Sequence, residues 1–386
     1  MAFGDFTVDR NSTKYVLGSG GDIISYATDE PAFEFNADGT YKGLLVEPAA
    51  TNICLQSDNF GTTWTNDRID TTSWLNQETA PDGNTTADKI IQESGETTAG
   101  YVAQFISVSA VVYTFSVFAK KGTRNIIKLQ ANLGGSNVGA WFDTDAGTVG
   151  TEESGITGAI SEYPNGWYRV SITFTALAGV MNFVIYNAES DNSLTVADDG
   201  GYQFVWGAQV ETGPIATSYI PTTTASVTRV KDDITQTSAS SLIGQTEGTL
   251  YVEVDWRKAT GTDQRLLNVN DGTGNNRVQI LNSSGGVLTM YAVANGATLT
   301  IQGESSTAYS GIQKFAFAYA DADFELYRNG SSISSDTVGS LAALATLTDI
   351  DLQDPVAGLQ PNLHIRAVAL FTRRLSDAEA QALTTL

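Results

Sequence analysis

Alternation of apolar and polar residues with a period of two is the feature that most constrains this fold. In the segment 167–175, aromatic and aliphatic residues alternate with Arg169, Ser171 and Thr173, which would point outward from a strand. Similar segments follow one another at intervals of about ten residues, and no helical stretch of useful length separates them. They include 111–119, 125–131, 138–142, 180–186 and 202–210. The pattern predicts an all-β chain built from antiparallel β-sandwiches of the jelly-roll kind.

The 386 residues suit two or three domains, and the strand segments fall into two groups. The first group lies within 52–222 and predicts one sandwich. A Thr- and Ser-rich linker, 223–233, follows it, and a second sandwich is predicted over 234–386. In the second group, Asn295-Gly296 and Asn329-Gly330 are strong hairpin signals. The two sandwiches are therefore expected in tandem.

Residues 1–51 form an N-terminal arm that is rich in turn signals and too small for a core of its own. The segment 32–35 can pair with 42–46 across the Asp38-Gly39 turn. The apolar run Leu44–Val46 predicts a short buried strand that packs on the first sandwich or on a neighbouring subunit. An Asp at Leu45 or Val46 is accordingly expected to release the arm or block assembly and to leave the C-terminal domain folded.

One short helix is predicted at the C-terminus. Ser376 and Glu379 have the spacing of a capping box, in which each side chain bonds to the other residue's backbone amide. Ala380, Ala382 and Leu383 follow with a short apolar face.

Composition excludes several functional classes. The net charge of −22 makes binding to nucleic acid or to an anionic membrane surface unfavourable, and it is explained by solubility or by occasional Ca²⁺ sites. The chain lacks an apolar run long enough to predict membrane insertion, and Met1–Asp5 has no features of a secretory signal. The single cysteine, Cys54, cannot form an intrachain disulfide and lies in apolar sequence, which favours a buried thiol. Synthesis in a cytoplasm is expected.

Several motifs occur together in a recognisable order. They are Gly43-Leu-Leu-Val-Glu-Pro-Ala-Ala-Thr-Asn52, Gln56–Phe60 with Trp64, Ala80–Lys89, Phe115–Lys120, Gly166–Val170, Trp206–Glu211 and Thr217–Thr222. This series resembles a family of bacteriophage virion proteins, often fibre or tail proteins, that contain a carbohydrate-binding-module-like jelly roll. The resemblance covers roughly residues 30–232. Residues 324–330 and 365–379 resemble a concanavalin A/laminin-G-type sandwich, a fold that includes sugar binders.

Aromatic side chains are the first candidates for a glycan site, since sugar rings stack on flat aromatic faces. Trp64 and Trp74 lie in polar, loop-like sequence, and Trp167 opens a strand, so these three are predicted as ligand-binding residues. The competing interpretation is that they cover the edge of a sandwich. Trp206 and Trp256 alternate with inward residues and are assigned to the core.

Acidic pairs and the lone histidine are the remaining candidates. Asp198 and Asp199, followed by two glycines, are the first choice for a Ca²⁺ site, although an isolated acidic pair is usually a solvated turn. His364 alternates with Leu363 and Ile365 and is expected at the surface. Catalytic motifs such as Gly-x-Ser-x-Gly or His-Glu-x-x-His do not occur, so no catalytic residue is assigned.

The resemblance implies a non-enzymatic virion structural protein, such as a fibre, spike or capsid decoration. It would be assembled in the host cytoplasm with other virion proteins and would attach to host-surface glycans. A homotrimer is expected by analogy with such appendages. The alternatives are a polysaccharide depolymerase and a purely structural cement protein without a ligand.

Overall fold

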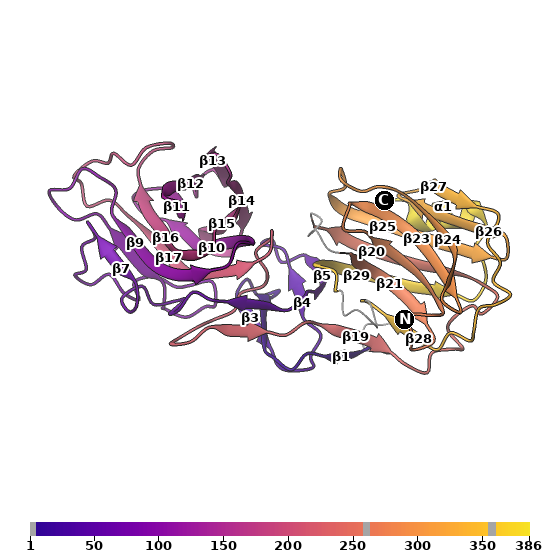
Figure 1. Ribbon diagram of the computed structural model, residues 1–386. Coiled ribbons are helices and arrows are strands. Elements are labelled where there is room, and N and C mark those ends of the chain that lie inside the picture. Colours follow the sequence, from indigo (N-terminus) through magenta and orange to yellow (C-terminus); the bar gives the residue numbers. More distant parts are fainter. Residues whose placement is uncertain (1–4, 258–262, 354–359) are drawn as a thin grey trace.

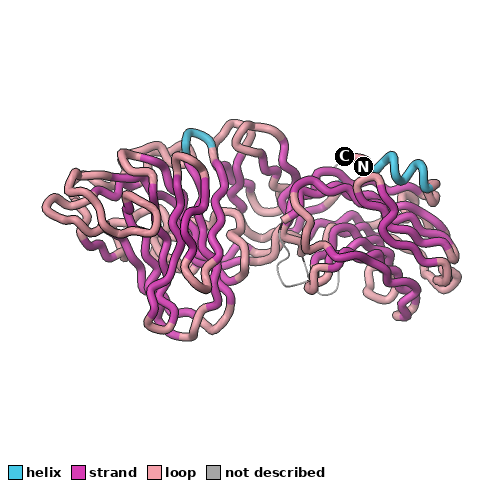
Figure 2. The backbone as a smooth tube through the Cα atoms, turned by 90° about the horizontal axis from the view of Figure 1, so that it is seen from above, coloured by secondary structure: helices cyan, strands magenta, loops and turns pink. Residues whose placement is uncertain are grey.

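The computed structural model describes residues 5–257, 263–353 and 360–386 and has two β-sandwich lobes side by side (Figure 1). Almost all regular structure is strand, and the view from above shows the C-terminal helix at the edge of the second lobe and a short helical turn in the first (Figure 2). The predicted all-β class, with sandwich domains and a short C-terminal helix, is confirmed. None of the helices in the described residues is long and apolar enough to cross a membrane.

The first lobe packs a five-stranded sheet, β14-β15-β10-β17-β8, against a six-stranded sheet, β13-β12-β11-β16-β9-β7. Its strands are β7 (Thr65–Asp67), β8 (Asp88–Ile91), β9 (Tyr101–Val108), β10 (Val112–Lys121), β11 (Ile126–Leu133), β12 (Ser136–Asp143), β13 (Thr148–Glu152), β14 (Thr157–Glu162), β15 (Trp167–Thr175), β16 (Gly179–Ala188) and β17 (Tyr202–Thr212). A 3₁₀ turn, Pro164–Gly166, joins β14 to β15. The core between the sheets includes Phe115, Phe142 and Phe183, which are fully buried.

The second lobe consists of two seven-stranded sheets, β1-β19-β28-β21-β22-β23-β24 and β27-β26-β25-β20-β29-β5-β4. The strands from the C-terminal part are β19 (Asp233–Gln236), β20 (Glu247–Trp256), β21 (Gln264–Asn270), β22 (Arg277–Asn282), β23 (Val287–Ala294), β24 (Ala297–Ser305), β25 (Gly311–Ala320), β26 (Asp323–Arg328), β27 (Ser331–Asp336), β28 (Asp349–Asp351) and β29 (Leu363–Phe371). Both Asn-Gly hairpins form as predicted, between β23 and β24 and between β26 and β27. Helix α1 (Asp377–Thr384) begins with the predicted Ser376–Glu379 capping box.

The N-terminal arm does not pack where the sequence predicted. Its strands are β1 (Thr7–Asp9), β2 (Lys14–Leu17), β3 (Ile23–Tyr26), β4 (Phe33–Phe35), β5 (Tyr41–Val46) and β6 (Ala50–Asn52), the last paired with β18 (Val227–Arg229). The hairpin of β4 and β5 forms as expected, but β5 then pairs with β29, so the arm joins the second lobe rather than the first. Strand β1 pairs with β19 in the opposite sheet of that lobe. Leu44 and Val46 are buried, as predicted, but in the core of the second sandwich.

The β2–β3 hairpin makes the connection to the first lobe. Ile23 is buried beside Trp167, Trp206 and Tyr219, and its amide donates to the Pro81 carbonyl at 2.7 Å. The arm therefore contacts both lobes, and the first lobe is inserted between the arm and the rest of the second lobe. Strand β5 pairs with β29 of the second lobe, whereas the β2–β3 hairpin that precedes it in the chain packs on the first lobe.

Gly43 fits β5 closely against β29. Its φ of +147° is one that other residues rarely adopt, and a Cβ would lie 2.8 Å from the Cβ of His364. The conformation therefore requires glycine, and this accounts for the first residue of the Gly43–Asn52 motif.

Candidate functional site

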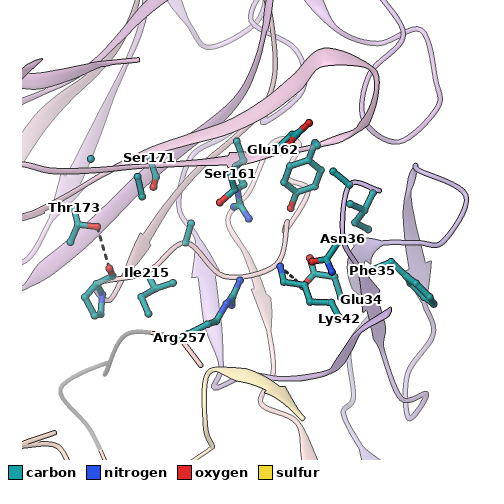
Figure 3. A pocket seen from close by; sticks show the side chains of 18 of the residues that line it. Glu34, Phe35, Asn36, Lys42, Ser161, Glu162, Ser171, Thr173, Ile215 and Arg257 are labelled. Atoms are coloured by element: carbon teal, nitrogen blue, oxygen red, sulfur yellow. Dashed lines mark hydrogen bonds and ion pairs between the residues drawn. The ribbon is translucent and has the colours of Figure 1, made fainter. Parts of the chain in front are cut away.

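A cavity of about 480 Å³ lies where the arm, the first lobe and the second lobe meet (Figure 3). It is lined by Leu17, Glu34, Phe35, Asn36, Ala37 and Lys42 from the arm, by residues of β14 and β15, by Pro214–Ala216, and by Arg257. A volume of this size is within the range of small-molecule pockets, and such sites commonly form between domains. We call it the junction pocket.

The floor of the junction pocket is the outward face of β14 and β15. Cross-strand pairing sets Thr157 opposite Thr173, Ala159 opposite Ser171 and Ser161 opposite Arg169. Successive side chains alternate between faces, so this polar row turns away from the core residues of the same strands. Thr173 donates to the Pro214 carbonyl at 3.3 Å, whereas the described residues provide no partner for the hydroxyls of Ser161 and Ser171. The floor thus presents free hydroxyl groups.

Arg169 is the cation of the floor, and it is only 8% exposed. Its Nη1 donates to the Thr217 carbonyl and its Nη2 to Ser116 Oγ at 3.0 Å. Its Nε is buried without a hydrogen-bond partner. A buried N–H without an acceptor is costly, so this site would be stabilised by a ligand or a water that supplies one.

Tyr163 continues the lining beyond β14 and remains a neutral phenol. Burial raises the pKa of Tyr163 to about 12, with a further contribution from the Glu34 carboxylate and opposition from Arg169. It offers an apolar ring and a hydroxyl to the pocket.

The opposite wall carries Glu34, Lys42 and Arg257 (Figure 3). Glu34 bonds to His364 Nε2, and its Oε2 lies 3.8 Å from Lys42 Nζ. Burial opposes ionisation of Glu34, but His364, Lys42 and Arg257 outweigh it and lower the pKa of the carboxyl to about 2. Burial lowers the pKa of His364, with Lys42 and Arg257 acting in the same direction. The Glu34 carboxylate opposes this shift in the pKa of His364 and hydrogen-bonds to its Nε2.

Arg257 lies on the same wall, and two residues outside the pocket lining, Asn362 and Glu47, position its guanidinium. Its Nη1 donates to Asn362 Oδ1 at 3.0 Å and lies 3.8 Å from Glu47 Oε1. The described residues offer no partner to its Nη2. The guanidinium is therefore positioned by the protein and still has donors left for a ligand.

The three tryptophans predicted as ligand residues lie in the interior. Trp64, Trp74 and Trp167 are 6%, 5% and 1% exposed, respectively. The indole of Trp64 packs against Phe60 and donates to carbonyls of Leu55 and Gln56, while that of Trp167 donates to the Thr79 carbonyl. With so little of each ring exposed, none offers a face on which a sugar could stack. Their burial favours the competing interpretation, in which they cover the edge of a sandwich.

Asp198 and Asp199 are also engaged by the protein. Asp198 Oδ1 accepts from the Gly95 amide at 2.8 Å, and Asp199 Oδ1 accepts from Arg124 Nη2 at 2.7 Å. No cluster of three or more metal-ligating side chains occurs in the described ranges. Asp199 therefore already pairs with a cation of the protein, the Arg124 guanidinium, through its Oδ1.

Other assignments divide between the interior and the surface. Trp206, Trp256 and Cys54 are buried, as predicted, and burial raises the pKa of the Cys54 thiol. The prediction that His364 is a surface residue is wrong, since its side chain is fully buried. Strand β5 pairs alongside this part of β29, with Leu45 opposite His364, and the His364 side chain bonds to Glu34. The periodicity of β29 alone could not reveal these neighbours.

One signal for the junction pocket is visible in the sequence, the outward row Arg169, Ser171 and Thr173. Lys42 and Arg257 were missed because they lie far apart in the chain and in segments that read as ordinary strands.

Neither the family models nor the curated proteins include a match to this chain. Among solved structures, the CBM40 module of the Ruminococcus gnavus IT-sialidase gives a TM-score of 0.33 at 16% identity, over 38% of this chain and 86% of that one. Sheep galectin-11 in complex with glycerol gives a TM-score of 0.23 at 14% identity, over 33% of this chain and 90% of that one. Trypanosoma rangeli sialidase in complex with the inhibitor DANA gives a TM-score of 0.31 at 13% identity, over 77% of this chain and 60% of that one. All three scores are below 0.5, so what this chain binds must be argued from its own residues.

Proposed function

We propose that this chain is a non-enzymatic structural protein of a bacteriophage virion that attaches to host-surface glycans through the junction pocket. The observation that carries the glycan proposal is the lining of the pocket. It combines the free hydroxyls of Ser161 and Ser171 with charged groups and with apolar surface from Phe35, Tyr163 and Ile215. A saccharide requires this combination, because its hydroxyls need hydrogen-bond partners and its C–H faces need apolar contact.

The virion proposal rests on the ordered motifs that resemble phage fibre and tail proteins, above all Gly43–Asn52. In this chain the motif supplies β5 and the buried Glu47, and so it places one wall of the pocket. Arrayed copies would raise the avidity of a weak single site, and a homotrimer is the arrangement we expect.

An enzymatic alternative would need a carboxylic acid that can donate a proton to a glycosidic oxygen. Two carboxylates line the described part of the junction pocket, Glu34 and Glu162. The pKa of Glu34, about 2, is too low for a general acid, whose pKa is normally raised. Alternation along β14 sets Glu162 on the opposite face of the strand from Ser161. These features support a binding role; release of reducing ends from host polysaccharide would contradict it.

Replacing Ser161 by Trp is expected to weaken glycan binding strongly. The larger side chain would project from an exposed position on β14 into the pocket and exclude a sugar ring without entering the core. Binding of the wild type would first be located on a glycan array and then measured by calorimetry, with a loss of about tenfold or more expected for the variant.

Ser332→Trp is the matched control, because it makes the same change at an exposed position on β27, in the other lobe. It should bind like the wild type. If the arrayed wild type binds no glycan, the binding proposal is wrong. If the protein is absent from purified particles labelled with a specific antibody, the virion proposal is wrong.

A further inference from the structure

The junction of the two lobes concentrates positive charge in a strongly acidic chain. The chain carries 21 Lys and Arg against 43 Asp and Glu. Six cationic side chains nevertheless meet here: Arg10, Lys14, Lys42, Arg169, Arg229 and Arg257. The carboxylates that pair with them or lie beside them are Glu34, Glu47, Glu211 and Asp232. Such a concentration of cations is unexpected if it serves only to balance the local carboxylates.

Charges of opposite sign differ in how far they reach the junction pocket. The cations Lys42 and Arg257 have side chains that are 26% and 25% exposed, whereas their carboxylate partners Glu34 and Glu47 are 8% and 0% exposed. The carboxylates of these two pairs are covered and their cationic partners are more exposed, while the exposed Glu162 of the lining lies on the opposite face of β14 from Ser161. A ligand entering the pocket therefore meets the positive ends of these ion pairs.

Hydrogen-bonding capacity shows the same imbalance. The Oε2 of Glu34 is engaged by His364 Nε2 and lies near Lys42 Nζ, so this acceptor is used within the protein. Donors remain at Arg257, at the buried Nε of Arg169 and at the hydroxyls of Ser161 and Ser171. These donors favour a ligand that supplies acceptor atoms.

We propose that the junction pocket selects an acidic saccharide and binds its carboxylate between Lys42 and Arg257. This inference rests on the proposed function and adds the ligand class to it. A neutral sugar could satisfy the hydroxyls of the floor, but it would offer neither cation a charged acceptor beyond Glu34 and Glu47. A carboxylate accepts bonds from both, and charge-assisted hydrogen bonds are stronger than neutral ones. The remaining sugar hydroxyls would bond to Ser161 and Ser171.

The test uses the full-length chain on an array of carboxylate-bearing glycans, each printed beside its carboxyl-reduced form and beside neutral glycans. Reduction removes the charge and keeps the sugar configuration. Binding to the acidic forms is expected to be at least about tenfold tighter than to the reduced forms and to weaken as salt rises. Lys42→Met and Arg257→Gln should each lose about tenfold in affinity for the acidic form and little for the reduced form. Lys42→Arg should retain the preference.

Lys121→Met is the control variant. It removes a cation from an exposed ion pair with Asp145, outside the pocket lining, and should leave the preference unchanged. Circular dichroism of each variant would confirm that it is folded. Equal binding of acidic and reduced glycans would overturn this inference and leave glycan binding standing. Binding to neither class would overturn the proposed function as well.

Discussion

Replacing Val46 by Asp is expected to unfold the second lobe and leave the first lobe folded. Val46 is fully buried in the core of the second sandwich and pairs with Leu363 of β29. A carboxylate at this position would have to be buried without a partner or expel β5 and β4 from their sheet. Either outcome should cost more than about 4 kcal/mol, a large part of the stability of an ordinary domain.

Hydrogen exchange measured by mass spectrometry separates the two lobes, because protection can be followed strand by strand. Loss of protection is expected in β20, β25 and β29 of the variant, with β10 and β15 still protected. Val338→Asp is the matched control: Val338 is 86% exposed in the same lobe, and its replacement should change stability by less than about 0.5 kcal/mol. Native protection of β29 in the Val46 variant would show that the arm is dispensable.

This expectation reverses the one drawn from the sequence, in which the C-terminal domain folds without the arm. Local patterns identified the strands and hairpins because alternation and turn residues act over a few positions. They could not identify the partner of β5, since pairing with β29 joins Leu44 to Ile365 across most of the chain. The sequence places the arm next to the first sandwich, but the strand that pairs with β5 is β29, near the C-terminal end of the chain.

The same limit explains the candidate site. Polar flanking residues made Trp64 and Trp74 look exposed, yet their loops fold back and the indoles enter the core of the first lobe. The row Arg169, Ser171 and Thr173 was visible as an outward face, but only the fold shows what faces it. Lys42 and Arg257 reach that row through tertiary packing, which single-sequence periodicity does not encode.

Replacing Glu47 by Gln is the second change with a large expected effect, because the buried Glu47 carboxylate contacts the arm, the linker and the first lobe. Its carboxylate lies 3.1 Å from Lys14 Nζ and 3.5 Å from Arg229 Nη1, and it accepts from the Ser218 amide at 2.9 Å. Its backbone exchanges two hydrogen bonds with Asp232. Gln keeps the shape of the side chain and removes the charge, which leaves Lys14 with Asp232 and Arg229 without a carboxylate partner among the described residues. Breaking a buried ion pair in this way should cost about 3–5 kcal/mol.

Glu78→Gln is the matched control, since it breaks the partly exposed pair between Glu78 and Lys120 and should cost about 1 kcal/mol or less. Denaturant unfolding at several pH values would compare both variants with the wild type. Burial opposes ionisation of Glu47, but Arg229, Lys14 and Arg257 outweigh it and hold the pKa of the carboxyl well below its usual value. A lowered pKa stabilises the folded chain above the unfolded pKa of about 4.3, and this contribution is lost as pH falls through the folded value.

The stability difference between the wild type and Glu47→Gln should therefore be constant from about pH 8 to pH 5 and shrink only in stronger acid. Adding Lys14→Met to Glu47→Gln should recover part of the loss, because it removes a buried cation that no longer has its full complement of partners. This recovery distinguishes uncompensated charge from a simple packing defect, which a second substitution would make worse. If Glu47→Gln is no more destabilising than Glu78→Gln, the Glu47 charge does not stabilise the contacts among the arm, the linker and the first lobe.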